Sequence, residues 1–329
     1  MTTVSFPGLG IGEFPVNSEA FSIGGAPIAW YALIICFGMI FAVGYVIYRA
    51  GQIGINSDHI IDFALFVIPF GVLGARLYYV IMDLENFDSF AEVLNIRGGG
   101  LAIYGGIIAG AITVFCVCLY KKIDFLAFAD CVVPGLIMAQ SIGRWGNFMN
   151  GEAFGGITDW FCRMGLRNSI TYNTFGTNET VFVHPTFLYE SLWNLSGVLL
   201  VYLFSRFVKK KYDGQLILLT FGWYGLGRMF IEGLRTDSLM IGDTGIRVSQ
   251  ALAALLLLVC LVLLIVLAIV KPKVELYQRP QLAEDEKLGS ISFKDRVKYL
   301  FVADNNPEIV KVPGKKKKNA DKENKENKE

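Results

Sequence analysis

The sequence carries almost no net charge and very little histidine. Its 30 lysines and arginines are balanced by 29 aspartates and glutamates, which leaves a formal net charge of +1, and it has 2 histidines. This near-neutrality excludes recruitment to nucleic acid by bulk positive charge, so we expect no nucleic-acid partner. The two histidines, His59 and His184, do not form an H-E-x-x-H pattern, and the sequence predicts no metal site.

Cysteine is sparse and has no informative spacing. None of the 6 cysteines has the spacing of zinc ligands or of a redox motif. Five lie within apolar stretches, where a free cysteine behaves as a small hydrophobic side chain. Cys162 lies in a more polar segment and is a candidate reactive thiol, although a surface role is favoured. The sequence therefore indicates no cofactor.

What the sequence has in abundance is long apolar stretches. Hydrophobic residues make up 53% of the chain, and the mean hydropathy is +0.48. Seven segments are long and apolar enough to cross a bilayer, which takes about 20 residues. They are 27–48, 60–82, 98–120, 124–143, 185–207, 213–234 and 247–270. The sequence thus predicts an all-α polytopic integral membrane protein.

The charged residues separate the chain into two unlike parts. Residues 271–329 hold 26 of the 59 charged residues, whereas the first 270 residues hold 33. We expect a transmembrane domain over residues 1–270, with an outer loop at 144–183. Residues 271–329 are expected to form a charged and largely disordered cytoplasmic tail.

The lysines predict the orientation in the membrane. Lys121 and Lys122 separate the third and fourth segments, and Lys209–Lys211 lie between the fifth and sixth. The loops at the opposite ends contain no lysine. By the positive-inside rule the N-terminus is outside and the C-terminus is cytoplasmic. The N-terminal stretch has no basic region, so we expect no cleaved signal peptide.

Ionisable side chains inside apolar segments are costly and are therefore candidates for function. With this orientation, most of them fall in the outer half of the bilayer: Arg76, Arg144, Glu190, Arg228, Glu232 and Arg235. Asp62 and Asp130 do not, and we expect them to have structural roles. Four polar side chains share one helical face because their spacing is four, four and three: Tyr224, Arg228, Glu232 and Arg235.

Several arginines with few carboxylates among them would leave an excess of positive charge that suits an anion. The planar fork of the guanidinium favours a phosphate. A structural interpretation stays open, in which Arg228 and Glu232 neutralise each other and Arg144 and Arg235 extend to the interface. The glycine-rich segment 98–106 indicates either close helix packing or irregular backbone lining a cavity.

Three longer motifs are more specific. They occupy residues 143–155 (GRWGNFMNGEAFG), 184–190 (HPTFLYE) and 224–238 (YGLGRMFIEGLRTDS). In this order they resemble the signature motifs of the prolipoprotein diacylglyceryl transferase family, and the resemblance extends over about residues 20–270. It implies seven spans with the N-terminus outside, in the bacterial cytoplasmic membrane, and an active site that faces the outer leaflet.

The resemblance also implies a reaction. Such an enzyme moves the diacylglyceryl group of phosphatidylglycerol to the thiol of the lipobox cysteine of a prolipoprotein. A thioether forms and glycerol phosphate leaves, as the first step of bacterial lipoprotein maturation. The implied partners are phosphatidylglycerol and the prolipoprotein signal peptide, and we expect a monomer without a cofactor.

This chemistry needs cations on the phosphate and a lowered pKa of the thiol. We assign the phosphate to Arg144 and Arg228, with Glu232 fixing Arg228. Asn147 and Glu152 would hold the headgroup glycerol or orient the arginines. The other expected site residues contact or position the substrates: Tyr31, Arg76, Tyr104, Gly155, His184, Tyr224 and Arg235.

Tyr104 departs from the family pattern, because many members have at this place a histidine that has been considered a base. Tyrosine, whose pKa is near 10, is a poor base at neutral pH. Tyr104 either forms only hydrogen bonds, or is activated by arginines, or is not needed because the field of the arginines ionises the thiol. We favour the last. His184 could act as the base instead, but its place before a proline at a span entrance favours a positioning role.

Two other classes of function were weighed. An anion or lipid transporter would use the same arginines, but repeated halves and interrupted helices at the midplane are not evident. An intramembrane hydrolase would need a Ser–His pair with a nucleophile motif. None is evident, although Ser141 lies one turn before Arg144.

Overall fold

The structure is a computed structural model that describes residues 2–84, 99–208, 210–238 and 245–270, with isolated positions 87, 89, 92, 93, 95, 240, 276 and 277. The expected tail therefore lies outside the described residues, apart from Leu276 and Tyr277. Lys209 and Gly98 also lie outside them.

The described part of the chain is mostly helical. The long helices are α1 (Trp30–Gly51), α2 (Ser57–Met82), α4 (Ile103–Lys121), α5 (Phe125–Asn150), α7 (Thr186–Leu203), α8 (Gln215–Glu232) and α9 (Val248–Val270). Among the described residues, all of these except α8 are long and apolar enough to cross a membrane, with α7 continuing to Val208. A protein with several membrane-spanning helices is thereby confirmed, whereas the seventh span stays a prediction.

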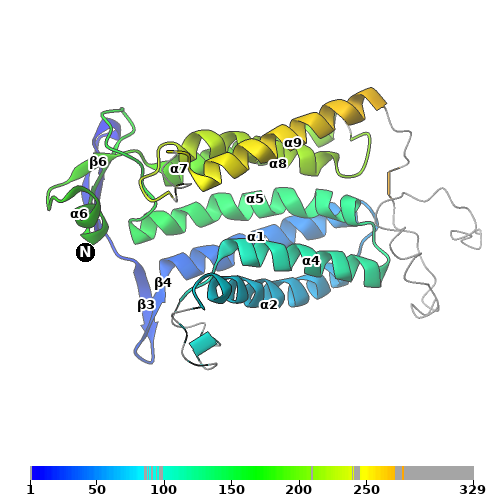
Figure 1. The fold of residues 1–329 in the computed structure, drawn as a ribbon, viewed down its shortest axis with the longest axis horizontal. Helices are drawn as coiled ribbons and strands as arrows, with labels where there is room; N and C mark the ends of the chain where they lie inside the picture. The colour runs from blue at the N-terminus through cyan, green and yellow to red at the C-terminus, as the bar shows by residue number, and fades with distance from the viewer. Residues whose placement is uncertain are drawn as a thin grey trace, which may run out of the picture. The chain divides into compact units, whose positions relative to one another are not determined.

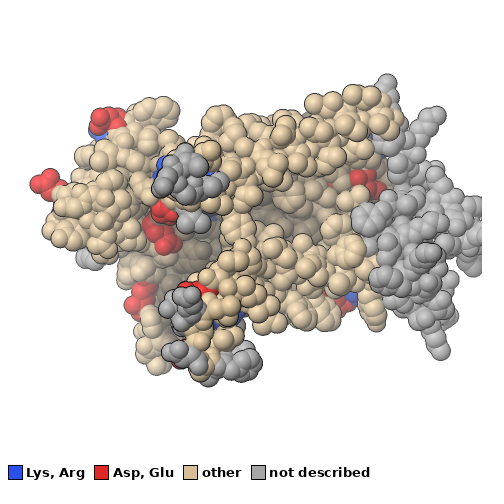
Figure 2. Space-filling view, in the orientation of Figure 1, with Lys and Arg blue, Asp and Glu red and all other residues tan. Residues whose placement is uncertain are grey.

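The composition of the helices explains this difference. The 23 residues of α9 include no charged side chain, and Figure 2 shows the surface over α9 without one. The 18 residues of α8 include Arg228, Glu232 and three glycines, which lower its hydropathy. A helix with this composition needs partners for its polar face, and α8 packs against α7 and α9, as can be followed in Figure 1.

The chain forms two compact units. The first comprises Met1–Ala50 and Leu126–Leu276, and the second includes Gly51–Phe125. In the first unit α7 is fixed to α8 by Trp193 and Trp223, whose rings stack with centroids 4.5 Å apart. Each indole donates a hydrogen bond to the other tryptophan's carbonyl, at 2.8 and 3.0 Å. This contact sets the register between the polar residues of α7 and those of α8.

In the second unit α2 packs against α4 through glycines. A Cβ atom at Gly74 would lie 2.8 Å from the carbonyl oxygen of Gly105, and one at Gly105 would clash with the carbonyl oxygen of Gly74. Gly99 and Gly100, which precede α4, have φ angles of 87° and 72°. Gly105 therefore permits close helix packing, and Gly99 and Gly100 permit irregular, left-handed backbone. Close packing and irregular backbone, the two expectations for this segment, thus apply to different parts of it.

Two small sheets in the first unit were not expected. The larger has the antiparallel order β2 (Ile11–Val16), β1 (Thr2–Phe6), β5 (Met164–Arg167) and β6 (Val181–Val183). The smaller is a hairpin of β3 (Glu19–Ile23) and β4 (Ala26–Ala29), and a short helix α6 (Ser169–Phe175) follows β5. Val4, Leu166 and Val183 form a core with Phe154 and Phe187, the second residue of α7. The larger sheet thus holds the entrance of α7.

Helix α5 is longer than the expected span. It continues to Asn150, seven residues beyond the expected end at Gly143. It stops where Gly151 adopts a φ angle of 63°, a left-handed conformation that glycine accepts readily. Arg144 and Asn147 consequently lie on the last two turns of a helix instead of in the expected outer loop.

Candidate functional site

Glu190, on α7, is the centre of a cluster of charged side chains. Nη1 of Arg228 lies 2.8 Å from each of its carboxylate oxygens. Nη2 of Arg144 lies 2.6 Å from Oε2, and Nη1 of Arg235 lies 3.5 Å from Oε1. The carboxylate is 4% exposed. One buried carboxylate therefore contacts arginines from α5, from α8 and from the turn after α8.

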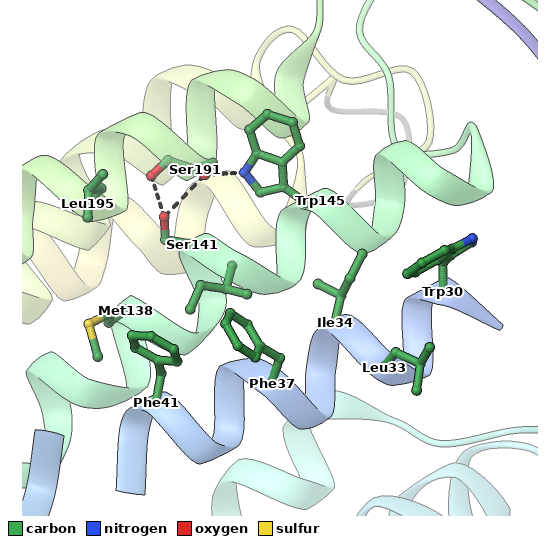
Figure 3. A pocket seen from close by; sticks show the side chains of 11 residues that line it. Trp30, Leu33, Ile34, Phe37, Phe41, Met138, Ser141, Trp145, Ser191 and Leu195 are labelled. Carbon is green, nitrogen blue, oxygen red and sulfur yellow. Dashed lines mark hydrogen bonds between the residues drawn. The ribbon is translucent and has the colours of Figure 1, made fainter. Parts of the chain in front are cut away.

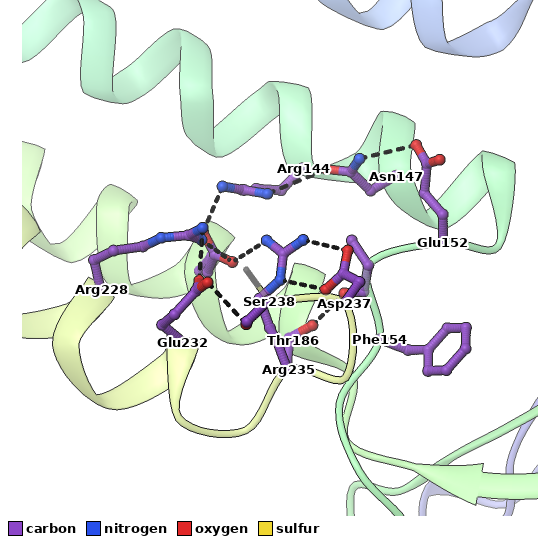
Figure 4. A network of polar contacts seen from close by, with 12 residues as sticks. Arg144, Asn147, Glu152, Phe154, Thr186, Arg228, Glu232, Arg235, Asp237 and Ser238 are labelled. Carbon is purple, nitrogen blue, oxygen red and sulfur yellow. Dashed lines mark hydrogen bonds and ion pairs between the residues drawn. The ribbon is translucent and has the colours of Figure 1, made fainter. Parts of the chain in front are cut away.

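Two further carboxylates complete the cluster, as Figure 4 shows. Oε2 of Glu232 lies 2.7 Å from Nη2 of Arg228, the pair that their spacing of four predicts. Asp237 accepts hydrogen bonds from Nε and Nη2 of Arg235, at 2.9 and 2.7 Å. Three arginines thus contact three carboxylates. The expectation of few carboxylates among the arginines is wrong, because Glu190 approaches from another helix and Asp237 lies beyond the span.

Arg144 differs from the other two arginines because it has a donor to spare. Its Nε is buried and has no hydrogen-bond partner among the described residues. Its Nη1 lies 3.4 Å from Oδ1 of Asn147, a long contact. Asn147 in turn donates a 3.0 Å hydrogen bond to Oε1 of Glu152, as does Asn150. The series of hydrogen bonds from Glu152 through Asn147 thus reaches the guanidinium of Arg144 on the side opposite Glu190.

A layer of neutral polar residues lies one helical turn from the charged cluster. Gln140 precedes Arg144 by four residues, Tyr224 precedes Arg228 by four, and Asn194 follows Glu190 by four. Nε2 of Gln140 donates to the hydroxyl of Tyr224 at 3.4 Å, and Nδ2 of Asn194 donates to Oε1 of Gln140 at 3.3 Å. Tyr224 therefore lies beside the cluster, whereas Gln140 and Asn194 were not expected because neither is ionisable.

An apolar cavity of about 650 Å³ lies between α1, α5 and α7. Figure 3 shows Phe37 and Phe41 projecting from α1 toward α5, with Phe41 beside Met138, while the indole nitrogen of Trp145 points to Ser191. The cavity's polar side chains on α5 and α7 are already paired, because Ser141 Oγ donates to the carbonyl oxygen of Ser191 at 2.7 Å, and Trp145 Nε1 to Ser191 Oγ at 3.1 Å. The hydroxyl of Ser141 is thus occupied by Ser191, which gives the hydrolase hypothesis no support.

Tyr31, in the first turn of α1, packs against the same end of α5. A Cβ atom at Gly146 would lie 2.7 Å from Cδ2 of Tyr31, so the ring rests on the glycine. Its position next to the turn that carries Arg144 and Asn147 is compatible with the substrate contact that the resemblance implies.

The guanidinium of Arg76 is hydrogen-bonded to backbone carbonyl oxygens. In the second unit its Nε donates to the carbonyl oxygen of Val93 at 2.9 Å, and Nη2 donates to that of Glu92 at 2.7 Å. Nη1 donates to the carbonyl oxygens of Gly99 and Gly100, at 2.7 and 3.0 Å. All three nitrogens thus hold backbone in this unit, and the expected contact of Arg76 with substrate stays a prediction.

Tyr104 belongs to the second unit as well. It lies in the first turn of α4, and its side chain is 43% exposed. Its expected contact with substrate stays a prediction.

Gly155 has a structural reason to be glycine. Its N–H donates to the carbonyl oxygen of His184 at 2.9 Å, and the N–H of Gly156 donates to that of Leu234 at 2.9 Å. A Cβ atom at Gly155 would lie 2.7 Å from Cβ of His184 and 2.9 Å from the oxygen of Leu234. Gly155 therefore joins the entrance of α7 to the turn that carries Arg235, and its expected contact with substrate stays a prediction.

Comparison with known proteins agrees with the resemblance of the motifs. A model of the family described as prolipoprotein diacylglyceryl transferase matches residues 18–266. The chain is 43% identical over 256 residues to phosphatidylglycerol–prolipoprotein diacylglyceryl transferase 1 of Clostridium perfringens. The aligned region covers 77% of this chain and 95% of the relative.

Two further relatives are similar. The phosphatidylglycerol–prolipoprotein diacylglyceryl transferase of Clostridioides difficile is 40% identical over 241 residues, 72% of this chain and 90% of the relative. That of Streptococcus equi subsp. equi is 38% identical over 253 residues, 75% of this chain and 93% of the relative. The residues that the family model matches include the whole charged cluster around Glu190.

Proposed function

The chain belongs to the prolipoprotein diacylglyceryl transferase family, and we propose that Arg144 is the principal phosphate contact of its reaction. The protein is a membrane transferase that uses phosphatidylglycerol and acts on prolipoproteins in lipoprotein maturation. The acceptor is the lipobox thiol, whose sulfur forms a thioether with the glycerol carbon. The bond between that carbon and the phosphate oxygen breaks, and glycerol phosphate leaves with the electron pair.

The spare donor of Arg144 is the observation that supports this assignment. Departure of glycerol phosphate develops negative charge on oxygen, and a fixed cation that keeps an unpaired N–H donor is well placed to stabilise it. Arg228 and Arg235 already contact two carboxylates each, whereas Arg144 contacts Glu190 and keeps Nε unpaired. Arg228 adds positive charge beside the phosphate while Glu232 fixes it. Tyr31 and Tyr224 supply hydroxyl contacts.

The surroundings of Arg144 fit the remainder of the lipid. Asn147 and Glu152 are hydrogen-bonded on the side away from Glu190, where they would hold the headgroup glycerol. The apolar cavity between α1, α5 and α7 begins within one turn of Arg144, at Ser141 and Trp145. We assign one acyl chain to this cavity, because its lining is apolar and its polar side chains on α5 and α7 are paired.

The arrangement in the membrane follows from the same proposal. Seven helices cross the bilayer with the N-terminus outside and the C-terminus cytoplasmic, and the protein acts as a monomer in the bacterial cytoplasmic membrane. The site faces the outer leaflet, where a secreted prolipoprotein presents its cysteine. Residues 1–270 form the catalytic domain, and residues 271–329 form a charged cytoplasmic tail without a catalytic role.

The deciding experiment is a reaction with defined substrates. Purified full-length protein in micelles containing phosphatidylglycerol is incubated with a lipobox peptide, and the peptide's mass and released glycerol phosphate are measured. Both products are expected in equal amounts, and replacing phosphatidylglycerol by phosphatidylcholine should remove both. The Clostridium perfringens relative serves as positive control. A folded protein that leaves the peptide unchanged while the relative modifies it would contradict the proposal.

A further inference from the structure

A second cavity, of about 540 Å³, lies where His184, Gly156 and the turn after α8 meet. Its polar lining includes His184, Arg235 and Arg247, together with the hydroxyl groups of Thr236 and Ser238. No carboxylate is among the described residues that line it. A cavity with two arginines, a histidine and hydroxyl groups suits a group that becomes negatively charged, such as a thiol that loses its proton.

This cavity is continuous with the charged cluster through Arg235. The side chain of Arg235 lines the cavity and approaches Glu190 with its Nη1 at 3.5 Å. Glu190 also holds Arg144 at 2.6 Å. A sulfur atom in the cavity would therefore be close to a phosphate on Arg144, while Arg247, which donates a 3.0 Å hydrogen bond to the carbonyl oxygen of Arg235, supports the shared wall.

The backbone of His184 is fixed on both sides. Its N–H donates to the carbonyl oxygen of Gly156 at 3.1 Å, and its own carbonyl accepts from Gly155 at 2.9 Å. Pro185 follows and begins the entrance of α7. Trp160 packs edge-on to the imidazole, with ring centroids 6.3 Å apart. The ring therefore has a defined position at the wall of the cavity.

One nitrogen of the imidazole is occupied and the other is available. Nδ1 lies 3.3 Å from the hydroxyl of Tyr189, and that hydroxyl lies 3.2 Å from Sγ of Cys162. If Nδ1–H donates to Tyr189 and Tyr189 donates to Cys162, the lone pair of the neutral ring is on Nε2. Nε2 has no hydrogen-bond partner among the described residues.

We propose that His184 is the base of the reaction, and that Nε2 takes the proton from the substrate thiol in the cavity beside Arg235. The sulfur then attacks the glycerol carbon, the carbon–oxygen bond to the phosphate breaks, and the proton on Nε2 is later released to water. This inference rests on the proposed function. It replaces ionisation of the thiol by the arginines alone, and it leaves Tyr104 without a role as a base.

The surroundings of the ring agree with this role. Among the described titratable and charged groups, Tyr189 contacts the ring, Cys162 contacts the hydroxyl of Tyr189, and Arg235 and Arg247 line the same cavity. Burial lowers the pKa of His184 below its ordinary value, so the imidazole is neutral and able to accept a proton at pH 7. Because protonation would occupy Nε2, kcat/KM should fall as the pH decreases through this lowered pKa.

The test combines a variant with a change of substrate. His184→Gln keeps hydrogen-bonding capacity but cannot act as a base, and we expect it to lower kcat/KM for a lipobox cysteine peptide at least about a hundredfold. A selenocysteine peptide, whose selenol is ionised at neutral pH, should recover most of this loss, which a merely structural role would not permit. His59→Gln, at the chain's other histidine, is the matched control and should change neither rate.

The wild-type enzyme tests the proposal even if the variant does not fold. With the cysteine peptide, kcat/KM should decrease toward low pH, a decrease called the acid limb of the pH profile. With the selenocysteine peptide this acid limb should be absent at the same pH values. The inference is overturned if both peptides show the same acid limb. It is equally overturned if a folded His184→Gln variant keeps near-normal rates or is not recovered by the selenol. Wild-type protein that modifies neither peptide would instead refute the proposed function.

Discussion

Arg144, Arg228 and Arg235 have the same formal charge and all contact Glu190, but their other contacts differ. Arg228 and Arg235 each contact two carboxylates, and their side chains order the cluster. Arg144 contacts Glu190 alone among these carboxylates and retains an unpaired Nε, so of the three arginines it is the one with a donor left for a ligand. This difference separates the effects that substitutions should have on activity from those they should have on folding.

Arg144→Ala is expected to abolish turnover, with a loss of at least about a hundredfold in kcat, because one fixed donor to a developing anion contributes this much. Release of glycerol phosphate at saturating phosphatidylglycerol measures it. Arg167→Ala, an exposed arginine on β5, is the matched control. Near-normal activity of Arg144→Ala would show that the phosphate binds elsewhere.

Glu190→Gln should impair folding more than any other single neutralisation in the cluster. It removes the carboxylate shared by three arginines, and breaking a buried ion pair typically costs about 3–5 kcal/mol. Asp237→Asn is the control, because Asp237 is half exposed and among the described residues forms an ion pair only with Arg235, so a loss of about 1 kcal/mol or less is expected. Thermal unfolding in detergent compares the two, and equal losses would contradict the central place of Glu190.

The charged residues of the site could be predicted from the sequence, because ionisable side chains are rare in apolar segments. Which arginine contacts which carboxylate could be predicted only in part. Glu232 was expected to fix Arg228 and does contact it, because both lie on one helix. The partners of Glu190 depend on how α5, α7 and α8 pack, which spacing along a single segment cannot reveal. The carbonyl oxygens that accept hydrogen bonds from Arg76 also belong to residues distant in sequence, before α4. Spacing within α2 therefore could not predict these contacts.

At the scale of the elements, the site depends on three segments that meet at Gly155. Gly155→Ala would force a Cβ atom to within 2.7 Å of His184 Cβ, so the entrance of α7 or the turn at Arg235 must shift. We expect a destabilisation of about 1–3 kcal/mol and a parallel loss of activity. Gly156→Ala is the matched control, since its Cβ would meet no atom within 4 Å. Equal behaviour of the two variants in thermal unfolding would contradict the interpretation.

The cavity between α1, α5 and α7 permits a test of the lipid's position. Ile34→Trp would fill space that we assign to an acyl chain, and it should raise the KM for phosphatidylglycerol while the peptide's KM is unchanged. The expected loss in kcat/KM is about tenfold, the equivalent of about 1.4 kcal/mol. Ile40→Trp, on the exposed face of the same helix, should have no such effect. An unchanged KM for lipid in Ile34→Trp would exclude this cavity.

The elements themselves were predictable to different degrees. Each expected span coincides with a helix because a run of about 20 apolar residues has few alternatives in a bilayer. Helix α5 extends seven residues beyond the apolar run 124–143, because the helix continues through the polar residues that begin with Arg144. Strands β5 and β6 contain only 4 and 3 residues, too few for an alternating pattern to predict them.

For the whole molecule, the orientation rests on the distribution of lysines. In a cysteine-free background, a cysteine at Ser18 should react with a membrane-impermeant reagent in intact cells, whereas one at Lys211 should react only after permeabilisation. Gel mobility of the labelled protein measures both. Labelling of the Lys211 position in intact cells would contradict the proposed arrangement.

The meeting of three arginines at Glu190 has a consequence for how this site can change. A simple ion pair can be inverted by exchanging its two residues. Exchanging Glu190 with Arg144 would instead place an arginine beside Arg228 and Arg235. No exchange of Glu190 with a single arginine restores opposite charges at every contact, so the charges of this cluster cannot be inverted in two substitutions. We expect variants selected from a random library to retain all four of these residues or to have lost the activity altogether.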